Sequence, residues 1–96
     1  MKRVVSPSLA ITTVDDLKFT NIYILETDEG DLLKLHCFEN GFTFVDLDTT
    51  CIHTPVHKYM EEAITEQLEF GMDVYEFETL TEFLEWAMER IHNEMV

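Results

Sequence analysis

Residues Leu32–Asp48 read LLKLHCFENGFTFVDLD, and this stretch carries the clearest fold signal in the chain. Two segments rich in apolar and aromatic residues flank the dipeptide Asn40-Gly41. A two-residue type I′ hairpin needs positive φ at both central positions, which makes Asn-Gly its strongest sequence signature. The stretch therefore predicts a hairpin of two strands, Leu32–Glu39 and Phe42–Asp48.

The position of the turn fixes which residues of the hairpin face each other. A loop centred on Asn40-Gly41 places Cys37 opposite Phe44 and Leu35 opposite Asp46. Residues that lie opposite each other on an antiparallel pair share one face of the sheet. The core face of the hairpin is therefore expected to carry Leu33, Leu35, Cys37, Phe42 and Phe44.

Further strands are expected on both sides of the hairpin in sequence. Lys18–Glu26, KFTNIYILE, is rich in β-branched and aromatic residues, which favour strands. Met72–Glu78 predicts a short strand whose aromatic side chains, Tyr75 and Phe77, share one side. Near the N-terminus, Ser8–Thr13 fits a short strand and residues 14–16 fit a turn.

The first helix is expected to begin near Thr54-Pro55, because Thr is a good capping residue and Pro suits the first helical position. It should run to about Phe70, where Gly71 can end it in the left-handed conformation. Its buried face is expected to carry Val56, Tyr59, Met60, Ala63, Gln67 and Phe70.

A second helix is expected from Leu80 to about Glu94. Thr79 and Glu82 have the spacing of a capping box, in which each side chain binds a free amide of the other residue. Apolar residues at helical spacing predict this buried stripe: Leu80, Phe83, Leu84, Ala87, Ile91 and Met95. Residues 1–96 therefore form one α+β domain, with an antiparallel three- to four-stranded sheet, two helices packed on one face, and the order β-β-β-α-β-α.

The charge of the chain is unusual for its size. The chain contains 6 Lys/Arg and 20 Asp/Glu, which gives a net charge of −14. Soluble domains are designed with a net charge of roughly 2–8 in magnitude, and a larger excess repels itself. The surface should repel nucleic acids and anionic membranes and attract basic proteins. No basic residue occurs between Lys58 and Arg90, where the acidic residues are Glu61, Glu62, Glu66, Glu69, Asp73, Glu76, Glu78, Glu82, Glu85 and Glu89.

These acidic residues predict a row of carboxylates on each helix. The first helix carries Glu62, Glu66 and Glu69, and the second carries Glu82, Glu85 and Glu89, each row on a single helix face. Like charges at this spacing destabilise a helix by a few tenths of a kcal/mol per pair, and neither row contains a compensating Lys. Each row spaces its negative charges like the phosphates of a nucleic-acid strand. The plainer alternative is a solvated helix face.

Other residues join this candidate surface. Asp73, Glu76 and Glu78 belong to it if the short strand is exposed. Trp86 projects about 120° from the middle of the buried stripe, beside the glutamates. It is either an exposed binding hot spot or packs against the sheet edge or the first helix.

The sequence gives little support for catalysis or cofactor binding. Cys51, His53, His57 and the His36-Cys37 pair do not have the spacing of a known zinc site, so we expect no metal. Cys37 is better explained as a small core residue. The chain shows no phosphate-binding Gly-rich loop and no oxyanion loop, so we expect no enzyme and no cofactor. With no secretion signal or membrane span expected, the two cysteines should be reduced thiols in a cytoplasm.

With its short length, strong acidity and two glutamate rows, the chain resembles the small, acidic, phage-encoded DNA mimics that disable host DNA-binding proteins. The resemblance lies in the general character of the whole chain and not in a motif. It implies a host-takeover protein in the bacterial cytoplasm. Its target would be a basic protein with a DNA groove, such as a nucleoid protein, and the carboxylates would replace phosphates.

We therefore expect an inhibitor that binds a basic nucleic-acid-binding protein and does not itself bind nucleic acid or membranes. One alternative is an immunity or antitoxin-type inhibitor that plugs a basic nuclease active site, with Trp86 as its aromatic anchor. The other is a soluble interaction domain that works through its apolar faces or as a homodimer. These alternatives stay open at the level of sequence.

Overall fold

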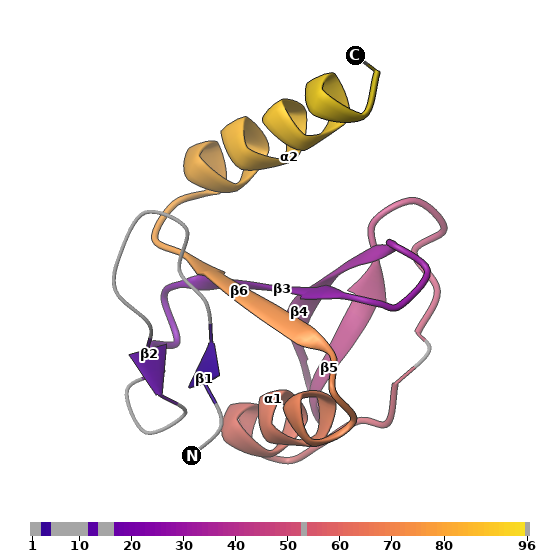
Figure 1. Ribbon diagram of the computed structural model, residues 1–96. Helices are drawn as coiled ribbons and strands as arrows, with labels where there is room; N and C mark the ends of the chain where they lie inside the picture. The colour runs from indigo at the N-terminus through magenta and orange to yellow at the C-terminus, as the bar shows by residue number, and fades with distance from the viewer. Residues whose placement is uncertain (1–2, 5–11, 14–16, 53, 96) are drawn as a thin grey trace.

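The computed structural model describes residues 3–4, 12–13, 17–52 and 54–95, with side chains described for 17–52 and 54–90. Two helices and a central sheet form the described part of the chain, which therefore has the α+β fold that the sequence predicts. Figure 1 shows how these elements are arranged. The elements are β1 (Arg3–Val4), β2 (Thr12–Thr13), β3 (Ile22–Glu26), β4 (Leu32–Phe38), β5 (Gly41–Asp46), α1 (Met60–Glu69), β6 (Asp73–Phe77) and α2 (Leu80–Met95).

The central sheet has four antiparallel strands in the order β5-β4-β3-β6. A separate two-stranded ladder joins β1 and β2, and it precedes the predicted β-β-β-α-β-α order. Of the strand predicted at Ser8–Thr13, only β2 is described. Residues 8–11 and the turn expected at 14–16 lie outside the described residues.

The two helices do not share one face of the sheet, which corrects the predicted packing. Tyr23 and Leu25 of β3 join the core cluster that contains α1. Ile24 of the same strand joins a second cluster, with Phe77 of β6 and Phe83 of α2. Successive side chains of a strand point to opposite faces, so α1 and α2 pack on opposite sides of the sheet, as Figure 1 shows. Both sides of β3 are therefore buried.

The hairpin turn lies one residue earlier than predicted. Phe38 pairs with Gly41 and Leu35 pairs with Phe44, so the two turn residues are Glu39 and Asn40. The pairing thus shifts by two positions relative to the prediction. An even shift keeps every side chain on its expected face, because the side-chain period of a strand is two.

The predicted core face of the hairpin is only partly buried. Leu33 and Phe44 are buried, and Leu35 and Phe42 are partly buried against them. Cys37 is exposed, so its interpretation as a core residue is wrong. It lies near the hairpin turn, where the last two residues of β4 are exposed.

Gly41 is required by its backbone conformation and by a close neighbour. Its φ is +139°, and a Cβ built on it would lie 2.2 Å from the carbonyl oxygen of His57. The segment around His57 runs beside β5 as a short antiparallel bridge to Phe42. The amide of Phe42 donates to the His57 carbonyl at 2.6 Å, and the amide of His57 donates to the Phe42 carbonyl at 2.8 Å.

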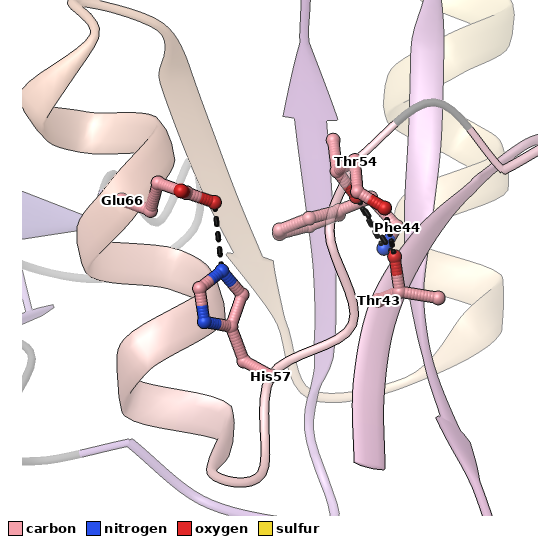
Figure 2. A network of polar contacts seen from close by, with 5 residues as sticks. All are labelled: Thr43, Phe44, Thr54, His57 and Glu66. Atoms are coloured by element: carbon pink, nitrogen blue, oxygen red, sulfur yellow. Dashed lines mark hydrogen bonds and ion pairs between the residues drawn. The ribbon is translucent and has the colours of Figure 1, made fainter. Parts of the chain in front are cut away.

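This bridge also explains why α1 begins later than predicted. Thr54 does not cap the helix, because its hydroxyl accepts a hydrogen bond from the amide of Phe44 at 3.2 Å and lies 2.8 Å from the hydroxyl of Thr43 (Figure 2). The extended segment continues to Tyr59, the residue that precedes α1. The helix ends as predicted, with Gly71 at φ +85°.

The later start changes the face that α1 buries. Its buried residues are Ala63, Ile64, Gln67 and Leu68. Of the expected set, Ala63 and Gln67 are buried and Met60 is partly buried. The other members of that set are exposed, namely Val56, Tyr59 and Phe70.

Helix α2 has the expected bounds but a different buried stripe. The hydroxyl of Thr79 accepts the amide of Glu82 at 3.2 Å, which confirms half of the capping box. The carboxylate of Glu82 instead accepts the amide of Glu78 at 3.3 Å. Phe83 is buried and Ala87 packs beside it, whereas Leu80 and Leu84 are exposed. The side chains of Ile91 and Met95 lie outside the described set.

Candidate protein-binding surface

The carboxylate row on α1 borders an open hollow of about 420 Å³. Glu62 and Glu69 are exposed, as the sequence predicts. Glu66 is partly buried, because Nε2 of His57 lies 2.7 Å from its Oε2 (Figure 2). When the imidazole is protonated, it neutralises the middle of this row. Sequence spacing alone could not show this contact, since it joins α1 to the extended segment before it.

The acidic residues around β6 differ in their exposure to solvent. Asp73 and Glu78 are exposed. Glu76 is 3% exposed and points toward the α1 side of the sheet, where the hydroxyl of Tyr23 donates to its carboxylate at 2.5 Å. Glu76 is therefore withdrawn from the candidate surface.

Tyr23 has a strongly perturbed environment. Burial, the hydrogen bond to Glu76 and the nearby negative charge all raise the pKa of its phenol. The phenol oxygen also accepts the amide of Lys18 at 2.8 Å. Tyr23 thus stays protonated and donates to the buried carboxylate, which is a structural role inside the core.

The row on α2 remains accessible. Glu85 and Glu89 are exposed, and Glu82 is partly buried where it binds the Glu78 amide. The guanidinium of Arg90, the basic residue next to this row, binds Glu26 of β3. Arg90 therefore ties α2 to the sheet, away from the two exposed glutamates.

Trp86 is a packing residue and not an exposed anchor. Its ring centroid lies 4.8 Å from that of Tyr75 and 5.3 Å from that of Phe77, both on β6. The guanidinium carbon of Arg90 lies 4.6 Å from the centroid of the indole. Of the two interpretations of Trp86, the structure shows the one in which it packs against the sheet.

The structure separates the two predicted rows. They belong to helices on opposite faces of the sheet, so they do not form one continuous line of charge. Within 17–52 and 54–90, the ion pairs are His57–Glu66 and Arg90–Glu26. On α1, on α2 and in the segment between them, the exposed carboxylates with no cationic partner in that part of the chain are Glu61, Glu62, Glu69, Asp73, Glu78, Glu85 and Glu89.

An exposed apolar row on α2 was missed from the sequence. Leu80, Leu84 and Met88 are 53%, 49% and 69% exposed, and their i, i+4, i+8 spacing places them on one helix face. Periodicity assigned two of these residues to the core, because it cannot tell a buried stripe from an exposed one. This row lies along the same helix as Glu85 and Glu89.

The other residues considered for chemistry are not brought together. Cys37 and Cys51 are free and exposed. Among the described residues, no group of three His, Cys, Asp or Glu side chains could hold a metal ion. His53 lies outside those residues. No helix in the described part of the chain is long and apolar enough to cross a membrane.

Comparison with known proteins adds no relative: no family model, curated protein or solved structure matches this chain.

Proposed function

We propose that this protein is a DNA-mimic inhibitor that binds a basic nucleic-acid-binding protein of a bacterial host and occupies its DNA groove. One observation carries the proposal. The seven exposed carboxylates on and between α1 and α2 have no cationic partner among the described side chains. Carboxylates without nearby cations repel each other. A basic groove that normally neutralises phosphates would relieve that repulsion.

The geometry favours α2 as the helix that enters the groove. Glu85 and Glu89 lie on the same helix as the exposed apolar residues Leu84 and Met88. Charges would guide the encounter, and buried apolar contacts would then slow dissociation. The α1 row, with Glu66 held by His57, is the weaker of the two. On this proposal the protein acts in the host cytoplasm by occlusion, without catalysis or a cofactor.

The test is capture of partners from a bacterial lysate at low salt, with the whole chain as bait and a stepwise salt wash. Two double variants remove the same charge from different helices, Glu85→Gln with Glu89→Gln and Glu62→Gln with Glu69→Gln. Glu82 is left intact, because its carboxylate binds the Glu78 amide at the start of α2. The matched control is Glu39→Gln with Asp48→Asn, two exposed acids outside both helices.

The expected result is retention of basic DNA-binding proteins that are released by salt and displaced by duplex DNA. The α2 variant should lower affinity for the purified partner by about tenfold or more, and the control should change it little. Equal affinities for the α2 variant and the control would remove the mimic mechanism.

A second candidate function rests on the apolar row of α2. An interaction domain that docks through Leu80, Leu84 and Met88 would bind in a way that added salt does not weaken. A partner that stays bound at high salt and ignores DNA, but is lost in Leu84→Ser, would favour this function over the mimic.

A further inference from the structure

A pocket of about 430 Å³ lies on the α1 side of the sheet, apart from both glutamate rows. It is bordered by the ends of β3, β4 and β5 and by the C-terminal half of α1, and it opens to solvent. Leu25, Leu33 and Met72 form its apolar part. Because Leu25 and Leu33 belong to the main core cluster, a rigid part of the fold supports the pocket.

The charged groups of this pocket all have the same sign. Asp28, Glu29 and Asp31 lie at its exposed rim, in the turn between β3 and β4, and none has a cationic partner among the described residues. Asp46 lines the pocket at 9% exposure, and its Oδ1 accepts the amides of Asp48 and Thr49. No described lining residue is basic. The pocket therefore selects against anions and favours a cation.

Gln67 supplies an independent sign of a ligand. This residue of α1 is 5% exposed and lines the pocket, and no described residue hydrogen-bonds its side-chain amide. Buried side-chain amides are almost always hydrogen-bonded. The carbonyl oxygen of this amide can accept a hydrogen bond from a ligand N–H group inside the pocket.

We propose that this pocket binds an alkylammonium or alkylguanidinium group, either as a small amine or as the side chain of a lysine or arginine. The aliphatic stem would pack on Leu25, Leu33 and Met72. The cationic head would donate to the carboxylates and to Oε1 of Gln67. An inorganic cation fits less well, because the carboxylates do not converge into a group that could hold a metal and one wall is apolar.

This inference does not depend on the DNA-mimic function. The pocket lies between α1 and the sheet, and none of the exposed carboxylates of the proposed mimic surface, on and between α1 and α2, lines it. Neutralising the pocket rim should leave the salt-dependent capture of a basic protein by α2 unchanged, so either proposal can fail alone.

The test is an NMR titration of the full chain with n-butylguanidinium and n-butylammonium, with n-butanol and butyrate as neutral and anionic controls. The cations should give saturable shifts at the side-chain amide of Gln67 and the methyl groups of Leu33. The dissociation constant should be on the order of 1 mM for ligands of this size. Equal responses to n-butanol, or no shift at Gln67, would overturn the proposal.

Variants then test the two kinds of contact. Asp28→Asn with Asp31→Asn should weaken the binding of either cation by about tenfold. Gln67→Leu removes the amide at similar volume and should weaken the binding as well, while the fold is retained. The control pair Glu39→Gln with Asp48→Asn carries the same charge change outside the pocket. An equal loss in the control would show general attraction to an acidic protein and reject the site.

The same titration separates the two sources of the ligand group. A capped Gly-Arg-Gly peptide that shifts the Gln67 amide as n-butylguanidinium does would assign the pocket to a side chain of a partner protein. Binding of the free cation without the peptide would assign it to a small amine. Either result supports the proposed ligand chemistry. If neither the free cation nor the peptide binds, the proposal is rejected.

Discussion

Nε2 of His57 lies 2.7 Å from Oε2 of Glu66, and this contact fastens the extended segment before α1 to the outer face of that helix. Both side chains are partly buried, at 22% and 27% exposure. A double-mutant cycle with His57→Gln and Glu66→Gln should give a coupling of about 1 kcal/mol in urea unfolding. The control cycle of His57→Gln with Glu62→Gln should be additive, and a zero coupling for the first pair would contradict the contact.

The buried hydrogen bond between Tyr23 and Glu76 predicts a stability effect of its own. Tyr23→Phe keeps the ring but removes one donor to a carboxylate that is 3% exposed. Loss of a donor to a buried charged group should lower the free energy of unfolding by about 2–3 kcal/mol. Tyr59→Phe is the matched control, because Tyr59 is 57% exposed. Equal unfolding midpoints for the two variants would show that the Tyr23 hydroxyl contributes nothing.

Gly41 and Gly30 form a natural pair for testing the hairpin. Both have positive φ, but only at Gly41 would an added Cβ meet another backbone atom, the carbonyl oxygen of His57. Gly30→Ala should cost about 1–2 kcal/mol from its left-handed conformation alone. Gly41→Ala should cost at least about 3 kcal/mol, because the bridge between Phe42 and His57 must also move. Thermal unfolding of both variants measures the difference, and similar costs would reject the close approach.

Local patterns in the sequence predicted the elements well, but not how they pack. The hairpin, the C-terminus of α1 and the cap at Thr79 depend on nearby residues, and each is confirmed within a residue or two. The start of α1 was wrong, because the Thr54 hydroxyl forms tertiary hydrogen bonds with β5 that outweigh its capping preference.

The face of the sheet that each helix covers was predicted least well, although the sequence of β3 indicated it. The run IYILE of β3 does not alternate between apolar and polar residues, as a strand covered on one face should. Its continuous apolar character indicates burial on both faces and so predicts a helix on each side. Among the candidate site residues, the burial of Glu76 had no such signal, because it depends on a phenol that lies 53 residues away in sequence.

Trp86 gives a direct test of the packing of α2 and of the nuclease-plug alternative. Its indole fills the space between α2 and β6, beside Tyr75 and Phe77. Trp86→Ala should lower the free energy of unfolding by about 2–3 kcal/mol, whereas Trp86→Phe should lower it by about 1 kcal/mol. Chemical unfolding followed by circular dichroism measures both changes. A Trp86→Ala protein of unchanged stability that has lost its partner would favour an exposed aromatic anchor instead.

His36 predicts how stability should change in acid. Its partial burial and the nearby charge of Lys34 both lower the pKa of its imidazole below the ordinary value of 6.5. As the pH falls through about 6.5, the unfolded chain takes up a proton at this position before the folded chain does. Protonation thus favours the unfolded state, and stability falls with pH until the folded imidazole also titrates.

His36→Gln removes this contribution, so the variant should lose less stability than the wild type between about pH 7.5 and pH 5.5. Urea unfolding at a series of pH values measures the two slopes, with Lys34→Gln as a second variant that should reduce the same effect. Parallel pH profiles for the wild type and His36→Gln would show that the environment of His36 does not disfavour its charged form.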